Sequence, residues 1–168
     1  ADGGRMMWLP QELILFDGAQ LDRRLTCGLG PEARLLLVEP VIFGRTEMGE
    51  TLRELSFQDR IKIDRAGVPL YRDSTRLTPD ALTRLAVTQG AGAMTNVIYA
   101  DADAEAQYHR ILDDLPPTAG ASLLQEGVLT VRLLAADGFE LRRILLPILD
   151  RLTGHTLPTS WRLCPMNL

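Results

Sequence analysis

The chain has 168 residues, enough for one domain to bury a hydrophobic core without disulfide bonds. Its 18 basic and 22 acidic residues are scattered, with no basic patch of the kind that binds nucleic acid, and no apolar run is long enough to cross a membrane. Residues 1–7 lack a signal-peptide core, and Cys27 and Cys164 form no CxxC pair. We therefore expect a cytoplasmic protein without a disulfide framework or a cysteine-based zinc site.

The first half of the chain is predicted to be β-structure. A short apolar run at 13–16 ends in a turn, which indicates a strand. Residues 33–43 are apolar on both faces, which is typical of a strand buried in the core. Apolar and polar residues alternate over 52–63, and the chain returns over 68–77 after a turn, so a long antiparallel hairpin is expected.

The second half changes to alternating strands and helices. Apolar residues recur with helical spacing between 102 and 115, which predicts an amphipathic helix. A second helix is predicted from Asp137, where Glu140 completes a capping box, to Gly154. Strands are expected at 93–100, 121–124 and 128–135. This order predicts helices that cover one face of an antiparallel sheet.

The change of pattern divides the chain into two parts that we expect to pack as one structural unit. Residues 1–85 are predicted to form a layered antiparallel β part, and residues 86–168 a small α/β part. The predicted fold class is therefore mainly β with a smaller α/β part, in which stacked antiparallel layers are followed by a strand-helix-hairpin-helix layer.

The motifs of common enzyme classes are missing from the sequence. It contains neither GxxxxGK[ST] nor GxGxxG, the loops that bind phosphate groups. The two histidines, His109 and His155, do not have the spacing of metal ligands or of a catalytic triad. These absences favour a binding protein that is not an enzyme and holds no tightly bound cofactor.

Two acidic residues are candidates for a functional role. Glu39 interrupts the most apolar strand, so its carboxylate should be paired, hydrogen-bonded or exposed to a wet cavity. Asp73 lies on the return strand of the hairpin. The structural alternatives are an ion pair between Glu39 and a nearby arginine, and a solvated strand face for Asp73. A hydrolase with these two as paired carboxylates is a further alternative, which needs both to face each other in a deep pocket.

A glycine-bracketed segment connects two predicted strands after Phe43. Gly44 and Gly49 delimit it, and Arg45 and Glu50 lie beside them. This pattern predicts a tight turn with an ion pair between Arg45 and Glu50.

Several short motifs, taken in their order and spacing, resemble the UreD (UreH) family of urease accessory proteins. They are Trp8-Leu9-Pro10-Gln11-Glu12, Phe16-Asp17-Gly18-Ala19, Gly44-Arg45 with Gly49-Glu50, Ala119-Gly120-Ala121-Ser122, Val131-Arg132 and Trp161-Arg162. The resemblance extends from Trp8 to about Leu163. Family members are longer and carry HPPGG-type and KFYRS-type motifs that this sequence lacks, so it resembles the C-terminal portion of the family.

The resemblance implies a function and a set of site residues. Family members are not enzymes; they bind apo-urease and, through UreF, the GTPase UreG, and they help to deliver nickel as cargo to the urease active site. The implied fold is β-helix-like in its stacking, with an acidic internal passage that Glu39 and Asp73 would line. An oxygen-only lining would hold nickel weakly, which suits passage rather than storage.

The family motifs also suggest residues for structure or interaction. These are Trp8, Pro10, Gly44, Arg45, Gly49 and Glu50. The alternatives are a protein-binding module unrelated to urease, or a truncated family member without function.

Overall fold

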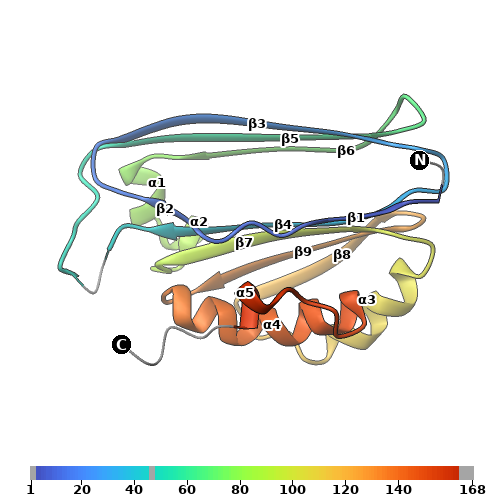
Figure 1. The fold of residues 1–168 in the computed structure, drawn as a ribbon. Helices are drawn as coiled ribbons and strands as arrows, with labels where there is room; N and C mark the ends of the chain where they lie inside the picture. The colour runs from blue at the N-terminus through green and yellow to red at the C-terminus, as the bar shows by residue number, and fades with distance from the viewer. Residues whose placement is uncertain (1–2, 46–47, 163–168) are drawn as a thin grey trace.

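Two β-sheets and a layer of helices are stacked in the computed structural model, which describes residues 3–45 and 48–162 (Figure 1). Sheet A, in the middle, has the order β1-β4-β7-β9-β8, with β2 also paired to β4. Its strands are β1 (Arg5–Trp8), β2 (Leu13–Leu15), β4 (Arg34–Phe43), β7 (Ala93–Ala100), β8 (Ala119–Gln125) and β9 (Val128–Ala135). Thr46 and Glu47 of the glycine-bracketed segment, and Cys164, lie outside the described residues.

Sheet B covers one face of sheet A, and helices cover the other. Sheet B has the order β3-β5-β6 and consists of β3 (Ala19–Leu29), β5 (Leu55–Arg65) and β6 (Val68–Leu77). The helices on that other face are α3 (Ala104–Leu112), α4 (Gly138–Thr153) and α5 (Thr159–Arg162). The short helices α1 (Pro79–Thr83) and α2 (Leu85–Thr88) follow β6 and lie at one end of the molecule, on the side of sheet B (Figure 1). Helices α3 and α4 pack on β7, β9 and β8, as the helical periodicity predicts (Figure 1). The expected class, mainly β with a smaller α/β part, is confirmed.

The path of the chain between the sheets explains why some strands pair in parallel. Strands β2, β3, β4 and β5 alternate between sheet A and sheet B, so each pair that meets within one sheet is separated by a strand in the other (Figure 1). As a result β1 and β2 pair with β4 in parallel, and β3 pairs with β5 in parallel. The two hairpins expected from the sequence, β5–β6 and β8–β9, are present and antiparallel. Strand β7 also pairs antiparallel with β4 and with β9. This alternation gives the first half its coil-like stacking.

Strand β3 was not predicted from the sequence. Its odd-numbered residues face sheet A, and most of them are apolar, as in a half-buried strand. Arg23 occupies one of these inward positions and interrupts the alternation. Arg23 is therefore the residue that breaks the expected alternation of β3, and it faces the interior of the molecule.

The core consists of one cluster beneath sheet A and two clusters between the sheets. Strand β4 is buried on both faces, as its sequence predicts: Leu36 and Val38 face the helices, while Leu35 and Leu37 face sheet B. The two clusters between the sheets are centred on Ile61 and Ile63, and on Phe57 and Phe43. Polar side chains separate these two clusters.

The capping pair predicted for the second long helix is present at α4, with Glu140 accepting from the residue before the N-cap rather than from the N-cap itself. The Asp137 side chain accepts the Glu140 N–H at 2.7 Å, and Glu140 accepts the Ala136 N–H at 2.8 Å. Gly154 ends the helix in a left-handed conformation with φ of 64°. The predicted boundaries of this helix are therefore confirmed.

Gly92, which precedes β7, is expected to be intolerant of any side chain. A Cβ at this position would lie 2.3 Å from the Ala136 carbonyl oxygen, so the backbone would have to shift. We expect Gly92→Ala to lower the free energy of unfolding by about 1–3 kcal/mol, measured by urea denaturation. Gly120→Ala is the matched control, because its Cβ would meet no atom within 4 Å. Equal stability of the two variants would contradict this packing.

Candidate functional site

A layer of polar side chains crosses the space between the two sheets. In sheet B, Arg23, Asp59 and Thr75 are neighbours in register on β3, β5 and β6. In sheet A, Glu39, Asn96 and Arg132 are neighbours in register on β4, β7 and β9. Together with Asp73 of β6, we call these residues the transverse polar layer.

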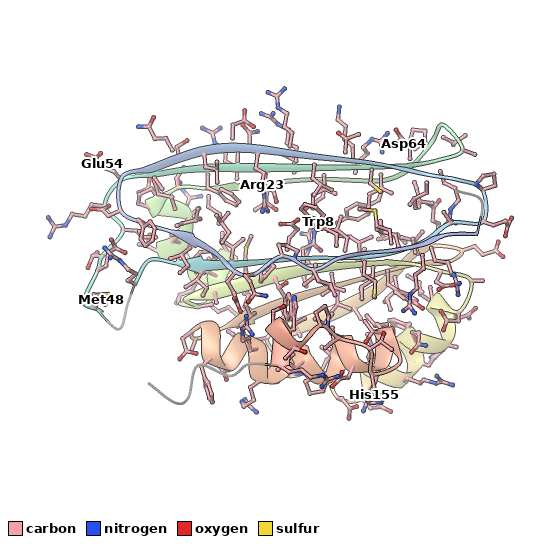
Figure 2. The ribbon with its side chains drawn as sticks, viewed as in Figure 1. Trp8, Arg23, Met48, Glu54, Asp64 and His155 are labelled. Carbon is pink, nitrogen blue, oxygen red and sulfur yellow. The ribbon has the colours of Figure 1, made fainter. Side chains whose placement is uncertain are left out.

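Glu39 is buried at one end of this layer and is bound from both sheets. Glu39 is only 3% exposed. Arg23 Nη1 lies 2.6 Å from Glu39 Oε2, and the Trp8 indole N–H donates to Glu39 Oε1 at 2.6 Å. Figure 2 shows Trp8 and Arg23 between the sheets. The ion pair with an arginine that the sequence allowed for Glu39 is therefore present.

Arg23 joins two buried carboxylates that come from different sheets. Besides Glu39, it binds Asp59 through Nε at 3.0 Å and through Nη2 at 2.6 Å. Asp59 is 7% exposed. A bidentate guanidinium–carboxylate pair fixes both direction and distance. The guanidinium thus holds β3 and β5 of sheet B against β4 of sheet A.

A break in the edge of sheet A lets Trp8 reach Glu39. Strand β1 pairs with residues 34–37 of β4 and β2 pairs with residues 41–43, so the edge is interrupted opposite Glu39 and Pro40. Pro40 has no N–H to donate, so the interruption leaves no backbone donor of Pro40 without a partner. Pro10 lies in the interruption and lines the neighbouring pocket.

The first and last family motifs meet at this break. The Trp161 indole N–H donates to the Leu9 carbonyl oxygen at 2.9 Å, and Trp161 is 1% exposed. Arg142 of α4 lies over the Trp161 ring and donates to Gln11 at 2.6 Å and to Glu12 at 2.9 Å. The segment that carries Trp8 is therefore anchored to the helical layer by contacts between residues far apart in sequence.

Asp73 lies at the other side of the layer and faces inward. Its side chain is 14% exposed and forms an ion pair with Arg132 of β9. Its Oδ2 accepts from Asn96 Nδ2 at 3.3 Å and from the Thr75 hydroxyl at 3.4 Å. The alternative of a solvated strand face is therefore wrong. Asp73 stands at an odd-numbered position of β6, on the same face as the buried Tyr71 and Leu77. Its neighbours Arg72 and Ser74 are on the exposed face.

The alternation of inward and outward positions along a strand could have identified two members of the layer that the sequence analysis missed. Asp59 stands at an odd position of β5 between Phe57 and Ile61, both buried. Arg23 holds the equivalent position on β3. Asn96 gives a weaker signal, because β7 is buried at nearly every position and its two faces cannot be told apart by burial.

A pocket lies at each end of the transverse polar layer. One, of about 390 Å³, is lined by Trp8, Arg23 and Glu39 between the edge strands β1 and β3. The other, of about 410 Å³, is lined by Asn96 and Arg132 together with residues of β6, β8 and α2. The layer therefore connects two indentations on opposite edges of the sheet pair.

One buried acceptor atom in the layer is left without a partner. Among residues 3–45 and 48–162, Asn96 Oδ1 has no hydrogen-bond partner, while Glu39 Oε2 is bound only by the Arg23 guanidinium, at 2.6 Å. The layer holds three carboxylates against the two guanidinium groups of Arg23 and Arg132. Its excess negative charge and the free Asn96 oxygen suit a cation or water.

The glycine-bracketed connection is a separate structural feature at the end of the sheets. Arg45 donates through its backbone N–H to Glu50 at 2.8 Å and through its side chain at 3.3 Å, so the expected ion pair is present. Gly44 and Gly49 have φ of 75° and 73°, which glycine adopts without strain. Arg45 also lies over the Phe16 ring. In Figure 2, Met48 of this connection lies at one end of the sheets, whereas Trp8 and Arg23 lie near their middle.

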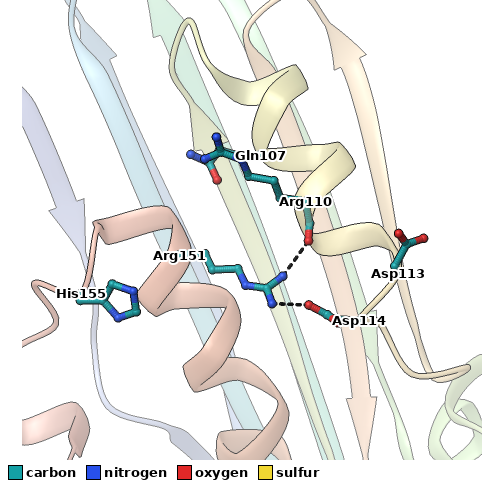
Figure 3. A pocket seen from close by; sticks show the side chains of 6 residues that line it. All are labelled: Gln107, Arg110, Asp113, Asp114, Arg151 and His155. Carbon is teal, nitrogen blue, oxygen red and sulfur yellow. Dashed lines mark hydrogen bonds and ion pairs between the residues drawn. The ribbon is translucent and has the colours of Figure 1, made fainter.

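A further pocket of about 500 Å³ lies between α3 and α4 (Figure 3). Arg151 of α4 forms an ion pair with Asp114 and donates to the Arg110 carbonyl oxygen at 2.6 Å, so these contacts fasten the two helices together. His155 lines the pocket. In the part of the chain that the structure describes, neither this pocket nor the transverse polar layer holds a group of three or more His, Cys, Asp or Glu side chains that could bind a metal ion. The polar lining of this pocket is accounted for by the contacts between the helices, and we assign it no chemistry.

Membrane insertion through a helix finds no support in the structure. Within the described ranges, no helix combines the length and the apolar composition that a bilayer span requires.

Comparison with known protein families identifies the family. The model of the family described as "UreD urease accessory protein" matches residues 1–162 and so includes every member of the transverse polar layer. The chain belongs to the UreD family. The alternative of a module from outside this family is therefore removed.

Curated UreD proteins resemble the chain over almost its full length. The relative from Ruegeria pomeroyi is 49% identical over 164 residues, which cover 96% of this chain and 64% of the relative. Those from Roseobacter denitrificans and Rhizobium rhizogenes are 46% and 41% identical, each over 96% of this chain and 60% of the relative. All three are named "Urease accessory protein UreD". The chain thus spans about three-fifths of the length of these relatives.

Two glutamates in this UreD chain are expected to change stability with pH in opposite directions. Burial raises the pKa of the Glu39 carboxyl, despite the opposing effects of Arg23 and Trp8. The Arg45 side chain and backbone N–H lower the pKa of Glu50. A raised folded-state pKa gives stability that is present below the unfolded pKa and lost as pH rises, and a lowered pKa gives stability that is lost as pH falls.

Glu39→Gln should therefore gain stability relative to the wild type as pH rises above the unfolded glutamate pKa of about 4. Glu50→Gln should be less stable than the wild type near pH 7, and this difference should shrink on acidification. Chemical denaturation at a series of pH values measures both. The same sign of pH dependence for the two variants would contradict the assignment of their environments.

Proposed function

We propose that the protein acts in urease maturation as a non-enzymatic scaffold and that its transverse polar layer passes nickel. In this role it binds apo-urease and, through UreF, the GTPase UreG, in the cytoplasm. The observation that carries the proposal is the layer of carboxylate, amide and hydroxyl groups that runs from a pocket at one edge of the sheet pair to a pocket at the other. The name shared by the relatives supports the link to urease.

The chemistry of the layer suits a cation that moves through rather than one that stays. Nickel binds nitrogen and sulfur ligands more strongly than carboxylate oxygen. The lining offers Glu39, Asp59 and Asp73, with two of the three already bound by Arg23. Weak oxygen ligands and a small excess of negative charge would admit a divalent cation and release it again. Nickel is then a transferred cargo and not a resident cofactor.

A docking role is supported by apolar side chains exposed on one edge of the molecule. Strands β1 and β2 and the turn after them form the free edge of sheet A. Their side chains exposed by 39–45% are Met6, Met7, Trp8, Ile14 and Phe16. Met6 and Trp8 of this group also line the pocket between the sheets. Apolar side chains left exposed along one edge are a common feature of protein interfaces.

An enzyme that uses Glu39 and Asp73 as paired carboxylates is less well supported. Glu39 stands on sheet A and binds Arg23, whereas Asp73 stands on sheet B and binds Arg132. The two carboxylates are thus paired with different guanidinium groups, and Glu39 shares Arg23 with Asp59. General acid–base catalysis needs both groups at one reacting centre.

Isosteric removal of either charge should impair nickel delivery. We expect Glu39→Gln and Asp73→Asn to lower the nickel content and activity of urease on the order of tenfold, the effect of losing about 1.4 kcal/mol of favourable interaction. Urease activity and nickel per urease are measured in cells that express the urease genes with each variant. Asp22→Asn is the control, because Asp22 lies on the exposed face of β3.

Normal nickel loading by both folded variants would exclude the layer as the route. Complete inactivity of the wild-type protein in the same assay would instead support the alternative of a family member without function.

The exposed edge is tested by a separate substitution. Ile14→Asp places a charge on the β1–β2 edge, where Ile14 is 40% exposed, and should abolish co-purification with apo-urease or with UreF. Val68→Asp, at a residue 65% exposed in the β5–β6 hairpin, should leave co-purification unchanged. The docking assignment fails if the two variants behave alike while both remain folded.

A further inference from the structure

Arg23 occupies the position that a bound cation would take between two buried carboxylates. Its Nη1 lies 2.6 Å from Glu39 Oε2 and its Nη2 lies 2.6 Å from Asp59 Oδ2, so its charge sits between sheet A and sheet B. Both acids are more than nine-tenths buried. Removal of the guanidinium would leave two desolvated carboxylates without a counter-charge, a strong driving force for taking up another cation.

Charge balance indicates a divalent cation as the substitute. With Arg23 in place, the three carboxylates of the layer outnumber its two guanidinium groups by one. With Arg23 withdrawn, the excess becomes two negative charges, which one divalent cation neutralises. The exchange therefore leaves the layer closer to neutrality than it was before.

One oxygen that the exchange would release and one that is already free can serve as ligands of such a cation. Glu39 Oε2 is bound only by Arg23 Nη1 and would lose that partner when the guanidinium leaves. Asn96 Oδ1, on the strand next to Glu39 and at the same register level, is unpartnered in the described part of the chain. Asn96 is 9% exposed, and an orphaned amide oxygen at such depth is costly unless water or a cation binds it.

The pocket beside β1 offers space for the Arg23 side chain when it is displaced. Arg23 lies on β3, an edge strand of sheet B, and it lines the pocket of about 390 Å³ beside β1. Its side chain is 26% exposed, although its partners Glu39 and Asp59 are only 4% and 9% exposed. A rotamer change toward the pocket would return the guanidinium to water and open the space between the two acids.

We propose that Arg23 is a tethered cation that closes the transverse polar layer, and that a divalent metal ion and the Arg23 guanidinium are alternative occupants of one site formed by Glu39 and Asp59. This inference rests on the proposed function for its biological meaning, because it makes Arg23 the gate of the nickel passage. The metal site itself is a property of the purified protein and is tested without urease.

The test is equilibrium dialysis of the purified protein against Ni(II) chloride. Arg23→Gln should bind one more Ni(II) ion than the wild type, with an affinity for that site at least about tenfold higher. Arg23→Gln/Glu39→Gln should lose the additional ion. Lys62→Gln, which removes a positive charge from the exposed face of the same sheet, should bind Ni(II) as the wild type does.

A second measurement addresses the folding of the variant. Because Arg23→Gln leaves two buried acids unpaired, its Tm should fall and should be restored selectively by Ni(II). Arg23→Lys keeps the charge but cannot form the bidentate contact, so it should bind Ni(II) with intermediate affinity. The gate is excluded if neither variant binds Ni(II) more tightly than the wild type, or if Glu39→Gln does not remove the gain.

Failure of the gate and failure of the proposed function can be told apart. If Arg23→Gln gains the site while Glu39→Gln and Asp73→Asn still load urease with nickel, the metal site stands and the passage is wrong. If those two variants block nickel loading and Arg23→Gln gains no site, the passage stands and the gate is wrong.

Discussion

The guanidinium of Arg23, held between Glu39 and Asp59, is the contact on which the arrangement of the two sheets depends. The two carboxylates are buried there between two clusters of mainly apolar side chains. An unpaired buried charge is strongly unfavourable, and removing one partner of such a pair costs about 3–5 kcal/mol. A wholly apolar layer would have served stability as well or better. Stability alone therefore does not account for the polar layer.

Contacts between segments far apart in the sequence position the groups around Glu39, which Arg23 binds. Trp8 reaches Glu39 because the edge strand is interrupted opposite Pro40, and the interrupted segment is held by Trp161 and Arg142 from the helical layer. The motifs at the two ends of the chain thus meet beside Glu39. The glycine-bracketed connection lies apart from them, where the chain crosses from sheet A to sheet B.

Much of the fold could be predicted from the sequence, because local patterns control it. The doubly apolar run of β4, the β5–β6 hairpin and the capping pair at Asp137 all follow from spacing and residue type. Parallel pairing of β3 with β5 could not be predicted in this way. It depends on how the chain crosses between layers, and the sequence of a strand does not record its partner.

The site was predictable only in part for the same reason. Burial of Glu39 follows from its apolar neighbours, and the parity of Asp73 with Tyr71 and Leu77 indicates an inward position. The partners of these acids could not be predicted, since Arg23 and Arg132 reach them from another sheet. Contacts across layers depend on the register of whole sheets, which one strand's pattern does not contain.

Anomalous diffraction at the nickel absorption edge tests the central claim most directly, on crystals of the protein soaked in Ni(II). The account predicts nickel within the transverse polar layer, between Glu39 and Asp59 or beside Asn96, with the Arg23 side chain displaced toward the β1–β3 pocket. Nickel bound only at surface sites, with Arg23 still paired to both acids, would contradict it.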